Sequence, residues 1–127
     1  MTSREIQPVV KRLSQSMIDR YADASGDHNP IHIDEAFART SPMGGIIAHG
    51  MLVLAFISEM MTAAFGRQWL ESGKLEVRFR APARPGDMIT ARPKPAGKDG
   101  DALRYNVVCV SGSGDVLISG TAQVQAS

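Results

Sequence analysis

The apolar residues of this chain follow two different periods. Residues 49–65 are apolar on nearly every side of a helix, which is typical of a helix buried inside a protein. After Gly66, apolar residues recur at every second position, beginning with Leu75, Val77 and Phe79, which is typical of a half-buried strand. The pattern therefore predicts one long helix followed by strands.

Three further alternating segments follow the first strand, with turn residues between them. The segments are 88–92, 103–111 and 116–124, and the turns are 85–86, 97–100 and 112–114. Four strands in series with short turns predict an antiparallel meander. Its apolar face needs a cover, and the helix at 49–65 is the only long apolar element in the sequence. We expect an α+β fold in which an antiparallel sheet wraps around one long central helix.

The first part of the chain predicts shorter elements. Residues 3–13 alternate loosely and indicate a first strand or an extended arm. Ser16 offers an N-cap for a short helix that ends at Gly26. Asp34 offers the cap of a second short helix, which the turn residues at 41–45 end.

Composition and charge limit the kinds of protein to which this chain can belong. The chain has 127 residues, 43% hydrophobic and 21% charged, which predicts a single globular domain over 1–127. A net charge of +1 gives no electrostatic reason to expect nucleic acid as a partner. Cys109 is the only cysteine and sits in an apolar strand, so we expect a buried thiol. Without a secretion signal pattern, a cytoplasmic protein is expected.

One segment has the length of a membrane span. Residues 44–65 are almost continuously apolar, but they include His49, Ser58 and Glu59. An acidic residue near the centre of a span costs roughly 2.5 kcal/mol or more. A helix buried in protein explains the segment better, and we expect no membrane partner.

A carboxylate and an imidazole stand five positions apart at Asp27 and His32. Pro30 lies between them, lacks a donor N–H and biases Asn29 away from helical geometry, so we expect a turn there that cannot be helical. Across such a turn the two side chains can face one another. A pair of this kind can hold one water molecule for general acid–base chemistry.

A metal site is the alternative interpretation, because Asp23, Asp27, His28, His32 and Asp34 cluster in the sequence. The helical histidine pair that commonly supplies two zinc ligands is not expected across the proline. We therefore expect no metal, and we expect His28 to be a solvent or packing residue.

The residues around this pair resemble a known family. The run from Tyr21 through Gly26-Asp27-His28-Asn29-Pro30-Ile31-His32, followed by Ala48-His49-Gly50-Met51, closely resembles the signature of the MaoC-like, R-specific enoyl-CoA hydratases. The resemblance implies a hot-dog fold. It also implies Asp27 and His32 as catalytic residues, a coenzyme A or acyl carrier protein thioester as substrate, and no cofactor.

Three more residues are site candidates. Gly50 stands where the long helix begins, so its N–H is expected to be free to stabilise a thioester oxygen, with close packing on the sheet as the alternative. By resemblance, Asn29 is expected to hold the loop around Asp27 and His32. Ser58 is expected either to contact the catalytic carboxylate or to be a plain buried hydroxyl.

The expected reaction is the reversible hydration of a trans-2-enoyl thioester to an R-3-hydroxyacyl thioester. Two alternatives stay open: a hot-dog thioesterase, and a non-catalytic subunit of a heteromeric dehydratase. Little proline or lysine protects the strands that end at Val124 or carry residues 107–110, so exposed sheet edges are expected there. A homodimer or a dimer of dimers is expected.

Overall fold

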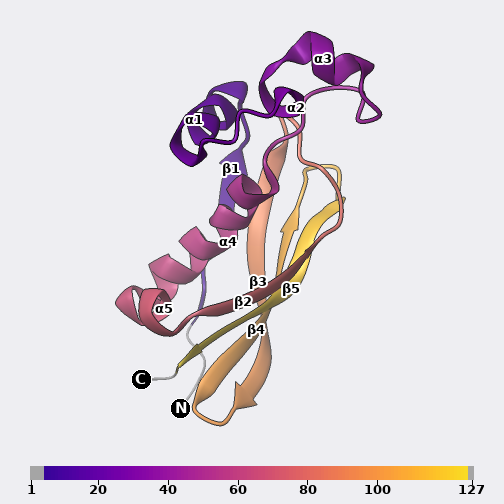
Figure 1. The fold of residues 1–127 in the computed structure, drawn as a ribbon. Helices are drawn as coiled ribbons and strands as arrows, with labels where there is room; N and C mark the ends of the chain where they lie inside the picture. Colours follow the sequence, from indigo (N-terminus) through magenta and orange to yellow (C-terminus); the bar gives the residue numbers. More distant parts are fainter. Residues whose placement is uncertain (1–4, 126–127) are drawn as a thin grey trace.

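One long helix lies across a five-stranded antiparallel sheet in the computed structural model, which describes residues 5–125 (Figure 1). The short helices that precede the long helix gather at the end of the sheet where it begins, and one further short helix follows its other end, as Figure 1 shows. The elements in chain order are β1 (Val9–Arg12), α1 (Gln15–Ser25), α2 (Pro30–Ile33), α3 (Glu35–Thr40), α4 (Gly50–Phe65), α5 (Arg67–Ser72), β2 (Lys74–Phe79), β3 (Met88–Asp99), β4 (Ala102–Val110) and β5 (Val116–Gln125). The predicted α+β architecture is confirmed.

The helix α4 forms the middle of the core and confirms the prediction for residues 49–65. It packs against β1, β3 and β4 and buries seven side chains. These are Leu52, Val53, Phe56, Ile57, Met60, Met61 and Phe65. Full burial of such a side chain stabilises by about 1.5–3 kcal/mol, so packing rather than helix propensity holds this element in place. An ion pair of 3.0 Å between Lys11 and Glu59 joins its exposed side to β1.

The strand order is β1-β3-β4-β5-β2, with every neighbouring pair antiparallel. The expected meander is therefore right for β3, β4 and β5, but wrong for β2, which pairs with β5. The turn at residues 85–86 does not close a hairpin. Instead, the N–H of Gly86 donates to the carbonyl of Leu13 at 2.7 Å, which ties this connection to the segment that follows β1.

The expected sheet edges are also corrected. Val124 and residues 107–110 lie on β5 and β4, which are interior strands with partners on both sides. The edges are β1 and β2 instead. The sequence could not show this, because which strand stands at an edge depends on pairing between segments far apart in the chain.

The helices before α4 differ in detail from expectation. Ser14, not Ser16, caps α1 by accepting from the N–H of Met17. Asp34 caps α3 as predicted, by accepting from the N–H of Phe37 at 3.0 Å. The turn at Pro30 was expected not to be helical, yet Pro30 begins the short helix α2. A first helical position tolerates proline because its N–H would have no helical partner there.

Other sequence predictions concern the remainder of the chain. The helix α5 was missed, because its six residues carry no clear period. Of the segment expected at 3–13, residues 3 and 4 lie outside the described residues.

Cys109 is buried as predicted, and burial raises the pKa of its thiol to about 12. Among residues 5–125, no helix is long and apolar enough to cross a membrane.

Gly120 decides whether β2 can lie beside β5. A Cβ at this position would fall on the carbonyl oxygen of Glu76 and the Cα of Val77, both in β2. Gly120→Ala is therefore expected to lower the free energy of unfolding by about 1–3 kcal/mol, as overpacking does. Urea denaturation followed by circular dichroism measures this change. The matched control is Gly112→Ala, whose Cβ would meet Met88 only at an ordinary 3.7 Å. Equal stability of the two variants would contradict the assigned role of Gly120.

Candidate active site

The loop after α1 presents Asp27 at the end of the molecule where α4 begins. Gly26 ends α1 in the left-handed conformation, with φ of 78°, which glycine adopts without strain. One carboxylate oxygen of Asp27 then accepts from the N–H of Asn29 at 3.2 Å. This bond fixes the direction of the carboxylate and leaves its other oxygen facing His32.

His32 is held by its backbone and by its ring. It lies in α2, which Asn29 caps by accepting from the N–H of Ile31 at 3.2 Å, so Asn29 holds the local backbone as expected. The ring is buried, and its Nδ1 lies 2.7 Å from the carbonyl oxygen of Ile47. A carbonyl only accepts, so Nδ1 carries a proton and donates to it, and Nε2 is the ring nitrogen that faces Asp27.

A short gap separates the two groups. The Nε2 of His32 lies 3.8 Å from a carboxylate oxygen of Asp27. This is longer than a direct hydrogen bond, but it allows a third small group to bond to both. The structure therefore brings Asp27 and His32 together as the sequence suggested. The pair can take a proton from a bound group and return one.

His49 is a site residue that was not singled out from the sequence. Its ring is buried and stacks on His32, with ring centres 3.8 Å apart and planes at 25°. Its Nε2 donates to the backbone carbonyl of Asp27 at 2.9 Å. His49 is also the N-cap residue of α4. It therefore ties the Asp27 loop to the start of the long helix and limits rotation of the His32 ring.

Gly50 is the first residue of α4, as predicted. The described hydrogen bonds include none donated by its N–H, as expected for the first turn of a helix. Phe79 of β2 lies directly against it, because an added Cβ would come 2.9 Å from the ring. A cavity of about 310 Å³ opens here, lined by Gly50, Ile47, Val53 and Phe79 among others.

The site candidate Ser58 lies away from Asp27 and His32. The Oγ of Ser58 accepts from the indole N–H of Trp69 at 3.1 Å. Eight residues of helix also place Ser58 about 12 Å along α4 from Gly50. Of the two alternatives expected for Ser58, these contacts favour the plain hydroxyl over a contact with Asp27.

His28 is exposed, as predicted. Its ring bonds to the carboxylate of Asp23 at 3.0 Å. This hydrogen bond is the main cause that raises the pKa of His28.

Three side chains at this site invite a metal interpretation. Asp27, His32 and His49 have potential ligand atoms within 4.8 Å of one another. However, the lone pairs of ring nitrogens lie in the ring planes, and the two histidine rings are stacked nearly parallel. Their lone pairs therefore do not converge on one point, as tetrahedral zinc requires. The geometry fits proton transfer better than metal binding.

Comparisons with known proteins identify the family of this chain. The profile of the family described as MaoC like domain matches residues 2–113. The chain is 32% identical over 116 residues to a 3-hydroxybutyryl-CoA dehydratase of Methylorubrum extorquens, covering 91% of this chain and 74% of that protein. It is also 32% identical over 118 residues to an (R)-specific enoyl-CoA hydratase of Rhodospirillum rubrum, covering 91% of this chain and 81% of that protein.

A solved structure gives the same fold. The (R)-hydratase of A. caviae superposes with a TM-score of 0.83 at 24% identity, covering 100% of this chain and 98% of that chain. The predicted hot-dog fold is confirmed. Because the family profile spans most of the chain and both relatives align over 91% of it, this protein belongs to the MaoC-like domain family.

Proposed function

We propose that this protein catalyses the reversible hydration of trans-2-enoyl thioesters to R-3-hydroxyacyl thioesters. The observation that carries the proposal is the Asp27–His32 gap of 3.8 Å beside the start of α4. The names of the relatives, an (R)-specific enoyl-CoA hydratase and a 3-hydroxybutyryl-CoA dehydratase, support the same reaction class. The thioester itself acidifies C2, so the proposed reaction needs neither a metal nor a redox cofactor.

In the hydration direction, one water molecule lies between Asp27 and His32. The pair accepts a proton from the water as its oxygen forms a bond to C3 of the enoyl group. The electron pair of the C2–C3 double bond moves toward the thioester, and the pair returns a proton to C2. Both additions come from one side of the substrate, because both groups lie on the same side of it. No net proton is gained or lost.

Negative charge develops on the thioester oxygen during this step. The N–H of Gly50 can donate to that oxygen, and the positive end of the α4 macrodipole favours the charge. The cavity beside Gly50 and Phe79 is then the place for the part of the substrate next to the thioester.

An assay with crotonyl-CoA distinguishes the three candidate functions. A hydratase removes the enoyl absorbance of crotonyl-CoA without free thiol, whereas a thioesterase releases free thiol, and a non-catalytic subunit does neither. No contact among residues 5–125 favours the second or third function over the first. A single buried cysteine and a thioester substrate also fit our proposal of a cytoplasmic enzyme.

The first test of this proposal concerns the acid–base pair. Asp27→Asn and His32→Ala are each expected to lower kcat for crotonyl-CoA hydration by about 10²-fold or more, the usual contribution of a positioned acid–base group. Because both act on one water, the double variant should be little worse than the worse single variant. His28→Ala is the matched control, since His28 faces Asp23. Normal turnover in either single variant would remove this assignment.

A second test isolates the N–H of Gly50. Gly50→Pro deletes this N–H at a helix position that tolerates proline, and His49 already has the extended geometry that precedes proline, with φ of −59° and ψ of 133°. Gly50→Ala keeps the N–H but brings the same Cβ against Phe79. Relative to the alanine variant, the proline variant should lose about 10²-fold in kcat. Equal rates in two folded variants would show that the thioester oxygen binds elsewhere.

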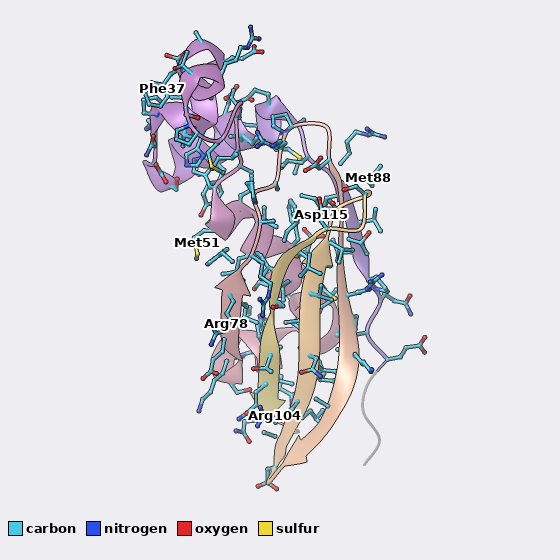
Figure 2. All side chains as sticks on the ribbon, turned by 90° about the vertical axis from the view of Figure 1, so that its right-hand side faces the viewer. Phe37, Met51, Arg78, Met88, Arg104 and Asp115 are labelled. Atoms are coloured by element: carbon cyan, nitrogen blue, oxygen red, sulfur yellow. The ribbon has the colours of Figure 1, made fainter. Side chains whose placement is uncertain are left out.

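We further propose that the protein forms a homodimer, or a dimer of dimers, through the free edge of β2. Phe79 on β2 and Met51 on α4 are 55% and 57% exposed, although both are large and apolar. They flank Gly50, so a second copy placed there would cover the cavity. Figure 2 shows Met51 projecting from the side of the molecule that carries Arg78 of β2. A solved structure of the same fold, the ChsH1–ChsH2 complex from Mycobacterium tuberculosis, is an assembly of two components.

Light scattering at micromolar concentration tests this assembly. We expect a dimer or a larger species for the unaltered protein, and a monomer with reduced activity for Met51→Asp, because burying an unpaired charge at an interface is costly. Leu70→Asp is the matched control, since Leu70 is 70% exposed on α5, at the other end of α4. A fully active monomer of the unaltered protein would contradict the proposal.

A further inference from the structure

On the face of the sheet opposite α4, basic side chains stand along two opposite margins, one on β2 and the other on β3. On β2, residues alternate between the helix side, where Phe79 contacts Gly50, and the opposite side, where Arg78 points. Arg80, directly after β2, has its Nε 2.6 Å from the Oγ of Ser119 on this same face. Across the sheet, Arg92 on β3 is also exposed.

The pairing register places short side chains between these basic ones. One row across the four strands consists of Arg92, Val108, Ser119 and Arg78. The next row consists of Lys94, Asn106, Thr121 and Glu76. The strands β2 and β3 are three strand spacings apart, a distance of about 14 Å. Long side chains on β2 and β3 thus form the walls of a trough whose floor is β4 and β5, and Figure 2 looks onto this face.

The trough is a real hollow with unbalanced charge. Its volume is about 880 Å³, and four basic residues but only one acidic residue line it. Among residues 5–125, none of the ion pairs involves Arg78, Arg92 or Lys94. The trough therefore concentrates more positive charge than the +1 net charge of the whole chain. Guanidinium groups are suited to phosphate.

Arg80 connects this trough to the site already described. It lines both the trough and the cavity beside Gly50, where the thioester of the proposed reaction binds. A flexible arm attached to that thioester can leave the cavity past the end of β2 and reach the trough. We propose that the trough binds the nucleotide end of coenzyme A, whose phosphates meet Arg78, Arg80, Arg92 and Lys94. This inference rests on the proposed function.

Two other occupants fit less well. A second copy of this chain would bring the same basic walls together, which repels. An acidic helix of a carrier protein would need an interface well beyond the trough, since stable protein complexes bury about 1,200 Å² or more. The volume of the trough instead lies within the range of small-molecule sites. Hydroxyl and amide groups of Ser119, Thr121 and Asn106 on its floor can bond to ribose and base.

A comparison of two substrates provides the first test. The trough variant combines Arg78→Ala, Arg92→Ala and Lys94→Ala. We expect its KM for crotonyl-CoA to rise about tenfold at unchanged kcat, since exposed ion pairs are individually weak. The N-acetylcysteamine thioester of crotonate, which lacks phosphates, should keep its kcat/KM. The control variant combines Arg20→Ala, Arg39→Ala and Arg67→Ala and removes the same charge from exposed helix positions. Two results would overturn the proposal. One is a rise in KM for crotonyl-CoA with the control variant, and the other is a rise in KM for both substrates with the trough variant.

Binding without turnover provides the second test and separates this inference from the proposed function. Adenosine 3′,5′-bisphosphate should bind the unaltered protein in calorimetry, bind the control variant equally, and bind the trough variant about tenfold more weakly. This result would support the trough even if the protein hydrated no enoyl thioester. Equal binding by all three proteins would overturn it. For the trough variant, an unchanged KM for crotonyl-CoA combined with a raised KM for crotonyl-acyl carrier protein would also overturn the inference. This result would assign the trough to a carrier protein.

Discussion

Burial of α4 against the sheet fixes the point at which this helix begins, and the site is assembled around that point. Seven buried side chains hold the helix, so its first residue, Gly50, has one position relative to β2. Phe79 lies against Gly50 on one side. On the other side His49 bonds to the backbone of Asp27 at 2.9 Å and stacks on His32. The apolar core thus sets the distance between the acid–base pair and the helix N-terminus.

This arrangement explains how the proposed reaction can take place at one end of a small fold. The core buries seven apolar side chains of α4, whereas the polar groups gather where its backbone N–H groups have no helical partners. The His32 ring is fixed by its bond to Ile47 and presents one free nitrogen. Asp27 is fixed by Asn29, which also caps α2. Each group therefore has a defined direction before substrate arrives, and preorganisation of this kind is a main source of catalytic rate.

Sequence reasoning found what is encoded locally and missed what depends on distant pairing. The helix α4 and the strands have clear periods, and Asp27 and His32 stand only five residues apart. In contrast, β2 pairs with β5 because Gly120 leaves room for it, and no local pattern reveals this. His49 belongs to the quoted signature, but its role was not predicted, because a bond to a backbone carbonyl leaves no mark in the sequence. The partner of Ser58 lies in α5, the helix that was missed. Proline at the start of α2 was misread as a break.

The proposed chemistry depends on how a thioester lies relative to these groups, and one measurement observes this directly. A crystal structure of the Asp27→Asn variant with bound crotonyl-CoA would show the substrate before reaction. We predict that the thioester oxygen lies within about 3.2 Å of the Gly50 nitrogen, and that C3 faces the gap between residue 27 and His32. A thioester whose carbonyl carbon, rather than C3, faces that gap would contradict the proposed hydration and indicate hydrolysis instead.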